Sequence, residues 1–250
     1  MADPAIDLSL IVPVRDGAER LPKALCDLRA YIAEAPAVRE LILIDDGSGA
    51  PTRQLLATFA AGTRGVTLLR NDVNTGKGHA VARGMLVARG RHRVFTDADL
   101  AYPVDQIAAI TAALTAGSDV AVACRVLPAS RYLMSPSFFH YLYTRHLMSR
   151  AFNAVVRWTL LPGILDSQAG LKGFTARAAE GVFSRLTIDR FGFDVEALLI
   201  ARRLGLRTTQ VPVFFRYDSE PSTVRLVGDG GGMVGDLLRI RWNDLRGRYR

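Results

Sequence analysis

The stretch Arg93-Val-Phe-Thr-Asp-Ala-Asp-Leu100 joins a short apolar run to two carboxylates in a turn. The run has the length of a buried strand, and neighbouring carboxylates repel each other unless a cation compensates them. Oxygen ligands favour a hard cation such as Mg²⁺ or Mn²⁺, which commonly also binds the phosphates of a substrate. We therefore expect Asp97 and Asp99 to be metal ligands, the alternative being an acidic surface turn without a ligand.

Apolar runs of strand length recur along the chain, and helical segments separate them. The expected strands cover residues 8–14, 41–44, 66–69, 93–96 and 119–124, and the expected helices cover residues 19–34, 51–61, 79–89 and 103–116. This alternation predicts an α/β fold with a mostly parallel central sheet and helices on both faces. Polar residues follow four successive strands, and ligands of open parallel sheets bind beyond the carboxyl ends of the strands. We therefore expect one domain with one crevice at that edge.

The composition of the 250-residue chain excludes several classes of protein. Its 49% hydrophobic and 22% charged residues are not those of a disordered chain, a collagen or a coiled coil. Cys26 and Cys124 have no Cys or His at metal-binding spacing, which predicts a reducing, cytoplasmic location without structural zinc. The first ten residues lack the pattern of a secretory signal, and no apolar run reaches the roughly 18–20 residues that span a bilayer. We therefore expect neither a secreted nor an integral membrane protein.

The chain is strongly basic, with 32 Lys and Arg residues against 24 Asp and Glu residues. Such a charge suits nucleic acid, an anionic membrane or phosphorylated substrates. Zinc-finger spacing, RNP-like aromatic motifs and basic heptads are missing from the sequence, so nucleic acid is not an expected partner. Residues 238–250 interleave arginines with Leu, Ile, Trp and Tyr, and residues 132–161 mix large apolar residues with Arg and His. Both segments fit either contact with an anionic lipid surface or ordinary amphipathic helices.

Two further polar segments follow expected strands. Asp45 and Asp46 come directly after residues 41–44, where a carboxylate can accept hydrogen bonds from a base or a ribose, or can cap the next helix. The segment Asn74-Thr-Gly-Lys-Gly-His79 sets two glycines and Lys77 before a helix but lacks the P-loop spacing. The first strand is not followed by G-x-G-x-x-G, which disfavours a nicotinamide-dependent oxidoreductase. A cationic loop beside a nucleotide is the expected role of Lys77.

In the order in which they occur, these motifs resemble those of family 2 glycosyltransferases of the GT-A fold, in particular the polyprenyl-phosphate (dolichyl-phosphate) glucosyl- and mannosyltransferases. The resemblance covers roughly residues 7–250 and rests on Ile11-Val-Pro13, Asp45-Asp-Gly-Ser48, Asn74-x-Gly-Lys-Gly78, Ala82-Arg-Gly-Met85, Ala88-Arg-Gly90, Asp97-Ala-Asp-Leu100, Asp166-Ser-Gln-Ala-Gly-Leu-Lys-Gly-Phe174 and Phe193-Asp-Val-Glu196. It implies a single, Rossmann-like GT-A domain. Residues 7–124 would bind the nucleotide sugar, residues 125–225 would bind the acceptor, and residues 226–250 would form a basic C-terminal helix.

The resemblance also assigns residues to the sugar donor. Asp99 would be the main metal ligand, Asp97 would touch the metal or the ribose, and Asp45 would recognise the base. Further donor contacts are expected from Pro13, Val14, Arg15, Asp46, Lys77 and Lys172. Relatives usually carry P-x-Y-N-E where this chain has Pro13-Val-Arg-Asp-Gly17, so the usual aromatic and acidic contacts to the nucleoside are missing and the nucleotide stays open.

The same resemblance assigns the acceptor side. Asp166 and Gln168 would lie near the transferred sugar as catalytic residues together with Asp99, and Asp166 would serve as a base or as a positioning carboxylate. A phosphate acceptor is already an anion and requires cationic positioning more than proton removal. We expect that positioning from Arg125, Arg131 and Arg145, the alternative being ordinary surface arginines.

The resulting expectation is an inverting, metal-dependent hexosyltransferase. It would move glucose from UDP-glucose, or mannose from GDP-mannose, to a polyprenyl phosphate, and would bind peripherally at the cytoplasmic face of the membrane. Ala101 favours glucose, because the mannosyl relatives often carry Gln at that position. Two alternatives stay open: a soluble transferase acting on a small acceptor, and a nucleotide-sugar-binding protein whose site no longer catalyses.

Overall fold

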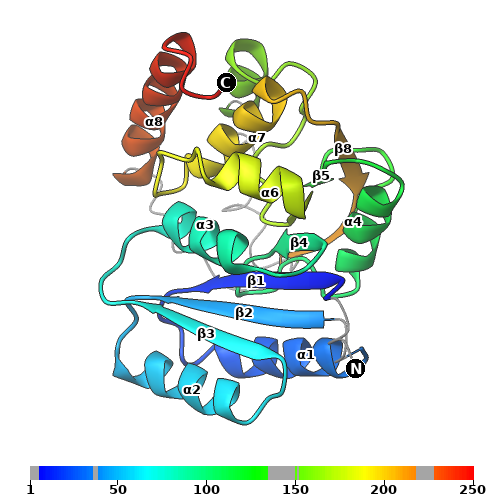
Figure 1. Cartoon of the computed structure of the whole chain (residues 1–250), viewed down its shortest axis with the longest axis vertical. Helices are drawn as coiled ribbons and strands as arrows, with labels where there is room; N and C mark the ends of the chain where they lie inside the picture. Colours follow the sequence, from blue (N-terminus) through cyan, green and yellow to red (C-terminus); the bar gives the residue numbers. More distant parts are fainter. Residues whose placement is uncertain (1–5, 36–38, 135–149, 151, 218–227) are drawn as a thin grey trace.

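The computed structural model describes residues 6–35, 39–134, 150, 152–217 and 228–250. At its centre is a seven-stranded sheet in the order β3-β2-β1-β4-β7-β5-β8 (Figure 1). The strands are β1 (Leu8–Val14), β2 (Arg39–Asp46), β3 (Val66–Asn71), β4 (His92–Phe95), β5 (Val120–Cys124), β7 (Lys172–Thr175) and β8 (Thr208–Pro212). Neighbouring strands of this sheet run parallel, except that β7 is antiparallel to both β4 and β5. The predicted mostly parallel sheet is confirmed.

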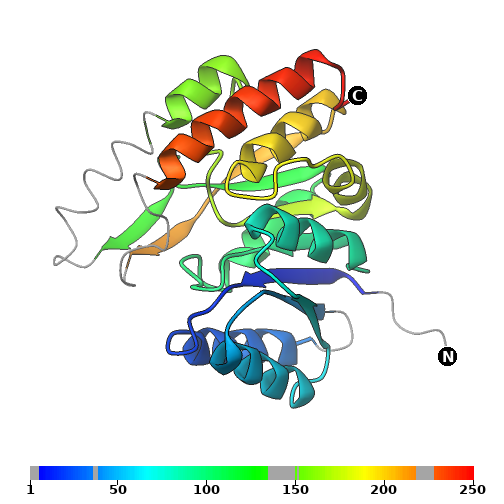
Figure 2. The same ribbon diagram turned by 90° about the vertical axis from the view of Figure 1, so that its left-hand side faces the viewer.

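Helices cover both faces of this sheet, as predicted (Figure 1 and Figure 2). One face packs against α1 (Leu21–Ala33), α2 (Ala50–Ala61) and α4 (Gln106–Thr115). The other face carries α3 (Lys77–Val87), α6 (Ala176–Phe183) and α7 (Phe193–Arg203), and α8 (Gly228–Leu245) packs on α7 from outside. Strand alternation produces the two cores, since Leu10 and Val12 point to the first layer and Ile11 points to the second. None of the helices within the described residues is long and apolar enough to cross a bilayer.

All four expected helices begin one to three residues from their predicted first residues, and two of these differences concern segments beside the acidic turn. The helix expected at residues 103–116 begins at Gln106, after a turn. The helix expected at residues 79–89 already begins at Lys77, because the carbonyl of Gly76 accepts the first helical hydrogen bond at 3.0 Å. The second difference matters for function, because it puts Lys77 at a helix N-terminus.

A second, two-stranded sheet pairs β6 (Arg131–Met134) with β9 (Phe214–Tyr217) in parallel. The strand pattern of the sequence does not predict it. The Arg216 N–H donates to the Ala101 carbonyl at 2.8 Å, which joins β9 to the turn after β4. The small sheet therefore projects from the molecule beside the acidic residues 97–99 (Figure 2).

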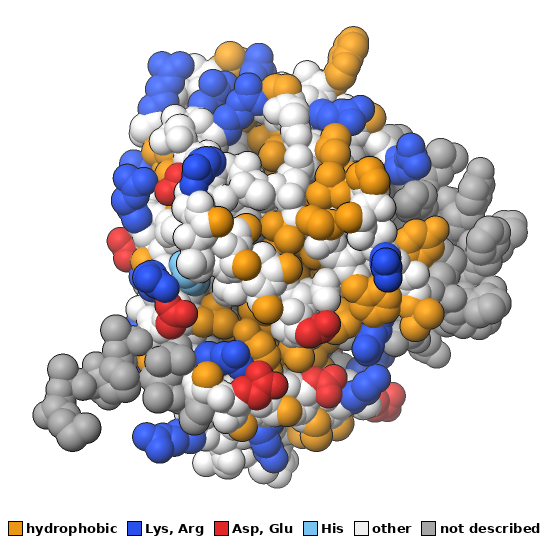
Figure 3. Space-filling view, turned by 90° about the vertical axis from the view of Figure 1, so that its right-hand side faces the viewer, with side chains coloured by type: hydrophobic (Ala, Val, Ile, Leu, Met, Phe, Trp, Pro, Cys, Tyr) orange, Lys and Arg blue, Asp and Glu red, His pale blue; other side chains and the backbone are white. Residues whose placement is uncertain are grey.

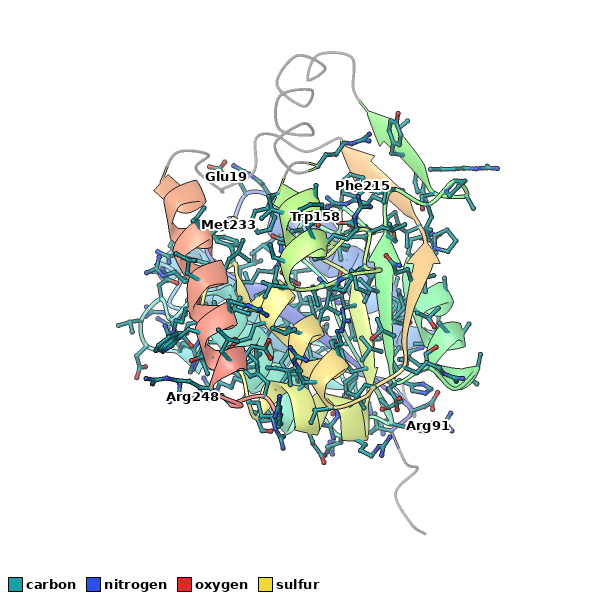
Figure 4. The ribbon with its side chains drawn as sticks, turned by 90° about the horizontal axis from the view of Figure 1, so that it is seen from above. Glu19, Arg91, Trp158, Phe215, Met233 and Arg248 are labelled. Atoms are coloured by element: carbon teal, nitrogen blue, oxygen red, sulfur yellow. The ribbon has the colours of Figure 1, made fainter. Side chains whose placement is uncertain are left out.

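Figure 4 shows the main sheet from above, with the two sides at which its strands begin and end, here called its edges. Glu19, Phe215 and Met233 lie toward one edge, whereas Arg91 and Arg248 lie toward the opposite edge. The first edge holds the carboxyl ends of the parallel strands, because Glu19 follows β1 and Arg91 precedes β4. β7 runs in the other direction, so the chain enters this strand at the first edge. The segments that follow β1 to β4 and the segment that precedes β7 therefore lie at the same edge.

Replacing Phe174 by Ala should destabilise the fold strongly. Phe174 of β7 is fully buried, and its ring centroid lies 5.0 Å from that of Phe183 and 6.5 Å from that of Phe95. We expect the free energy of unfolding to fall by about 3–5 kcal/mol, because the truncation removes apolar contacts and leaves a cavity. Urea unfolding measures the effect. Trp158→Ala is the control, since that side chain is 91% exposed, and equal costs for the two variants would contradict the assigned core.

Candidate active site

The loops after β1 and β2 are tied together at the carboxyl edge. The backbone N–H of Asp16 donates to the Ser48 hydroxyl at 2.9 Å, and the Asp16 carboxylate accepts from the Gly49 N–H at 2.9 Å. Asp16 has a left-handed backbone with a φ of 52°, a conformation that short, locally bonded polar side chains tolerate best. The residues that replace the usual family pattern after β1 therefore join two loops of the crevice.

Asp45, near the end of β2, is almost fully buried. One carboxylate oxygen accepts a hydrogen bond from the Ser48 N–H at 2.8 Å, and the other forms an ion pair with the guanidinium of Arg70. Arg70 comes from β3, and the sequence analysis does not single it out. Since Arg70 already compensates the charge of this carboxylate, the base of a nucleotide would have to bind Asp45 beside Arg70 or in its place.

Asp46 fixes the loop that leads from β3 to α3. Its carboxylate accepts from the backbone N–H groups of Thr75 and Gly76 at 2.9 and 2.8 Å and from the Asn71 amide at 2.8 Å. Burial acts to raise the pKa of Asp46, but these hydrogen bonds outweigh it and lower the pKa below its ordinary value. Asp46 therefore stays ionised and shapes the loop from within. It does not cap the next helix, because α2 has Gly49 at its N-cap and no side-chain hydrogen bond there.

Lys77 begins α3 and directs its ammonium at the acidic turn after β4. Its Nζ lies 2.6 Å from Oδ1 of Asp97. Gly76 before it has a φ of 104°, which glycine alone adopts readily, so the turn that aims Lys77 requires this residue. Burial acts to lower the pKa of Lys77, but the charges of Asp97 and Asp194 outweigh it and raise the pKa. The ammonium therefore stays protonated.

Asp99 is the more open of the two acidic side chains. It lies on a tight turn in which Leu100 has a φ of 48°, and its carboxylate accepts a hydrogen bond from the Ala101 N–H at 3.0 Å. The side chain reaches solvent, yet the surrounding protein removes part of its hydration. This desolvation, and after it the charge of Asp97, raise the pKa of Asp99. A bound cation would relieve both effects.

The acidic pair fits a hard divalent cation whose remaining ligands come from elsewhere. Asp97 and Asp99 offer carboxylate oxygens, which Mg²⁺ and Mn²⁺ prefer, and Mg²⁺ is commonly held by one or two carboxylates with substrate phosphates. Within the described residues, no cluster of three His, Cys, Asp or Glu side chains could hold a metal alone. Phosphate oxygens and water would therefore complete the site, and Lys77 would have to leave Asp97 for a phosphate.

Residues 166–171 cross the carboxyl edge and close against the acidic turn. A Cβ added at Gly170 would overlap the Asp97 carboxylate, so a larger residue would force that side chain away from its present position. The Leu171 carbonyl accepts from the Ala123 N–H of β5 at 3.1 Å, which fixes the other side of the segment. The predicted motif of residues 166–174 and the acidic pair are therefore in direct contact.

Asp166 and Arg125 form a largely buried, two-pronged ion pair beyond β5. Nε and Nη2 of Arg125 donate to the two carboxylate oxygens at 2.7 and 2.8 Å. Burial acts to raise the pKa of Asp166, but the hydrogen bonds and charge of Arg125 outweigh it and lower the pKa. A carboxylate with a lowered pKa is a weak base at neutral pH, so the geometry suits positioning better than proton removal.

Lys172 has no exposed surface. Its ammonium pairs with the Asp194 carboxylate and donates to the Ala169 carbonyl at 2.6 Å. Burial lowers the pKa of Lys172. The expected contact of Lys172 with the donor stays a prediction, and it would require these internal bonds to open.

Two polar atoms at this edge are buried without a hydrogen-bond partner among the described residues, Oγ1 of Thr96 and Nε2 of Gln168. A buried polar group without a partner costs roughly 1–3 kcal/mol and is rare in folded proteins, so a bound ligand is one explanation. Gln168 belongs to the predicted catalytic set. Thr96 does not, although it directly precedes the acidic pair.

The other predicted residues lie in different places. Pro13 and Val14 end β1, with Val14 buried, and Arg15 is exposed at the same edge. Arg131 is exposed on β6, and its contact with an acceptor phosphate stays a prediction. Arg145 lies outside the described residues.

Shallow grooves of about 260 and 310 Å³ lie elsewhere on the described surface. The first is lined by His79 and Arg83 of α3 and by Asp189, and the second is lined mostly by apolar residues such as Leu161 and Leu206. Figure 3 shows hydrophobic side chains gathered across the face that carries β8 and α4, with basic side chains around them. Neither groove includes the acidic pair, so the candidate site is identified by the chemistry of its residues and not by a cavity.

Replacing Arg125 by Met should leave the buried Asp166 carboxylate without its partner. At about pH 7 we expect the free energy of unfolding to fall by roughly 3–5 kcal/mol. The lowered pKa means that ionised Asp166 stabilises the wild type, and this contribution is lost only as the pH falls through that pKa. The variant instead becomes more stable when its Asp166 carboxyl is protonated, because a neutral carboxyl does not require a charged partner. The deficit should therefore shrink between about pH 7 and about pH 4.

Urea unfolding across this pH range measures the effect. Arg125→Met combined with Asp166→Asn is the control, because it has no carboxyl at this position to titrate. A deficit of the single variant that does not change with pH would contradict the pairing.

Comparison with known proteins agrees with the resemblance of the motifs. Residues 9–157 match the model of the family described as Glycosyl transferase family 2. A dolichyl-phosphate beta-glucosyltransferase of Dictyostelium discoideum is 30% identical over 254 residues, which cover 98% of this chain and 77% of that protein. The dolichyl-phosphate beta-glucosyltransferase of Homo sapiens is 30% identical over 258 residues, which cover 99% and 78%.

Solved structures share the fold at lower sequence identity. Glucosyl-3-phosphoglycerate synthase from Mycobacterium tuberculosis in complex with Mn²⁺, UDP-glucose and phosphoglyceric acid has a TM-score of 0.66 and 19% identity, with coverage of 94% of this chain and 79% of that chain. Its complex with Mg²⁺ and UDP has a TM-score of 0.66 and 18% identity, with the same coverage. The predicted GT-A arrangement is thereby confirmed. The chain belongs to glycosyl transferase family 2 and is related to the dolichyl-phosphate beta-glucosyltransferases.

Proposed function

We propose that the chain transfers glucose from UDP-glucose to a polyprenyl phosphate of the dolichyl type, with inversion at the anomeric carbon. The observation that carries the proposal is the cluster of Asp97, Asp99 and Lys77 at the carboxyl edge, against which Gly170 closes. The cluster combines oxygen ligands for a cation with an ammonium for a phosphate. Relatives of nearly full-length similarity that are named dolichyl-phosphate beta-glucosyltransferases support the choice of glucose and of a lipid phosphate.

The acidic turn and Lys77 together suit a donor diphosphate. Asp99, with Asp97 beside it, would hold Mg²⁺ or Mn²⁺, which when bound acts as a Lewis acid on the leaving diphosphate. Lys77 would donate to a phosphate oxygen, whose negative charge would then take the place of the Asp97 charge beside the ammonium. Asp45 and Pro13 at the ends of β2 and β1 would contact the nucleoside.

The acceptor side supplies cations and no strong base. Arg125 is held by Asp166, whose lowered pKa makes it a positioning carboxylate, and Arg131 would add a second positive charge. Gln168 would donate its unpaired amide N–H to the sugar or the acceptor. An oxygen of the acceptor phosphate then forms the bond to the anomeric carbon while the bond to UDP breaks, which inverts the configuration. No proton has to be removed from an ionised phosphate.

α8 offers a surface for an anionic membrane. Large apolar residues recur at helical spacing along it and are between 55% and 69% exposed: Val234, Leu238, Trp242 and Leu245. Exposed arginines accompany them: Arg239, Arg241, Arg246 and Arg248. Ile240 on another side of the helix is fully buried, so the helix docks on the protein while it presents this stripe. Apolar and basic residues combined in this way suit peripheral binding to anionic lipid, which we propose for the cytoplasmic membrane face.

Replacing Asp99 by Asn should remove most of the transfer activity. The amide keeps the size of the side chain but lacks the charge that binds a divalent cation, so we expect at least about a 100-fold loss of turnover. Release of UDP from UDP-glucose in the presence of Mn²⁺ and a polyprenyl phosphate measures it. Asp105→Asn, at an exposed position beyond the turn, is the control and should retain activity. A wild-type protein without turnover for any donor would instead indicate a binding protein.

Replacing both Leu238 and Trp242 by Ser should weaken binding to vesicles that contain phosphatidylglycerol. Loss of two apolar side chains from the lipid contact should lower the partition constant about tenfold or more. Flotation of the vesicles measures this constant. The control is Val73→Ser, which alters a 68% exposed residue in the loop after β3. A wild-type protein that binds neither anionic nor neutral vesicles would contradict the lipid acceptor and favour a soluble one.

A further inference from the structure

Tyr249, which follows α8, is fully buried. Its hydroxyl donates a hydrogen bond to Oε1 of Glu196 in α7 at 2.6 Å. Burial, and after it the bond to Glu196, raise the pKa of Tyr249 well above its ordinary value, so the phenol stays protonated and remains a donor. The C-terminal segment is therefore joined to the interior through a polar contact in addition to its apolar packing.

Glu196 also has no exposed surface, and it collects four hydrogen bonds. Besides the Tyr249 hydroxyl, its carboxylate accepts from the hydroxyl and the N–H of Thr187 at 2.6 and 2.9 Å and from the N–H of Ile188 at 2.8 Å. The Asn243 amide of α8 donates to the Thr187 hydroxyl at 2.9 Å. The loop between α6 and α7 is thus held by Glu196 and α8 together.

This loop packs directly on the start of α3, where Lys77 lies between two glycines. A Cβ added at Gly76 would overlap the carbonyl of Asp189. A Cβ added at Gly78 would lie 2.5 Å from the carbonyl oxygen of Ile188. The Asp189 carbonyl also accepts a backbone hydrogen bond from the first turn of α3 at 3.1 Å. The position of the loop therefore decides the position of the helix start that carries Lys77.

We propose that Glu196 and Tyr249 are positioning residues for Lys77 and, through it, for the diphosphate of the donor. The proposal rests on the proposed function, because it assumes that Lys77 contacts this diphosphate. The chain of contacts runs from Tyr249 to Glu196, from Glu196 to residues 187–189, and from these residues to the start of α3. Removing the phenol hydroxyl leaves a buried carboxylate with one donor fewer, which loosens the loop and lowers the preorganisation of Lys77.

Tyr249→Phe tests the proposal, because it removes only the hydroxyl. Calorimetric titration measures the Kd for UDP in the presence of Mn²⁺, and steady-state kinetics measure KM for UDP-glucose and kcat. We expect the Kd and the KM to rise about threefold to tenfold while kcat changes less than about twofold. Glu196→Gln, which replaces one acceptor oxygen by an amide nitrogen, should cause a larger rise.

A double-mutant cycle separates positioning from general loosening. In a Lys77→Ala background, Tyr249→Phe should cause no further loss of UDP affinity, because the group that the hydroxyl positions is gone. Asp244→Asn is the matched control. Its carboxylate docks α8 through two 2.6 Å bonds to Arg203 of α7, so the variant should lower the melting temperature without changing the Kd for UDP.

An unchanged Kd for UDP in Tyr249→Phe would overturn the positioning role, and so would equal losses in the wild-type and Lys77→Ala backgrounds. A different result bears on the proposed function. If the wild-type protein does not bind UDP with Mn²⁺ at all, the donor assignment itself fails.

Discussion

The ion pair between Lys77 and Asp97 is the interaction on which the site depends. It joins the loop after β3 to the turn after β4, and Gly170 from the segment before β7 closes against the same carboxylate. The ammonium compensates the charge of a carboxylate that lies beside Asp99. A cation and a diphosphate can take over this pairing without leaving a charge uncompensated, because the cation pairs with the carboxylates and the phosphate pairs with the ammonium. Lys77 and Asp97 thus carry the two opposite charges that a metal-bound diphosphate would compensate.

The topology explains why these segments meet. Parallel strands β1 to β4 end at one edge, and the antiparallel β7 begins there, so residues 166–171 pass the acidic turn on their way into the sheet. The arrangement brings the Asp166–Arg125 pair and Gln168 to the edge at which the donor would bind. On the far side of α3, Glu196 and Tyr249 hold the loop that supports Lys77. The groups proposed for the donor and those proposed for the acceptor therefore lie on segments of the same sheet.

Much of this could be predicted from the sequence, because each of the first strands is an apolar run that ends in a polar turn. Strands β7 and β8 are not among the expected strands, and the four residues of β7 carry no period that marks a strand or its direction of pairing. The two-stranded sheet of β6 and β9 was not predicted either, because its strands are short and lie far apart in the sequence.

The partners of charged residues were the least predictable part of the site. Arg70 beside Asp45 and Asp194 beside Lys172 depend on proximity in three dimensions, which spacing does not encode. The family resemblance implied a donor contact for Lys172, yet the structure buries that ammonium against the Asp194 carboxylate. The sequence indicated Gly170 only as part of a motif. The close approach of the Asp97 carboxylate, which explains the glycine, is visible only in the structure.

The most direct measurement is a crystal structure of the protein with UDP and Mn²⁺. The account predicts a Mn²⁺ ion in contact with the Asp99 carboxylate and with diphosphate oxygens, and a Lys77 ammonium that has moved from Asp97 to a phosphate. A nucleotide bound away from this turn, with the Lys77–Asp97 pair intact and Asp99 facing solvent, would contradict it.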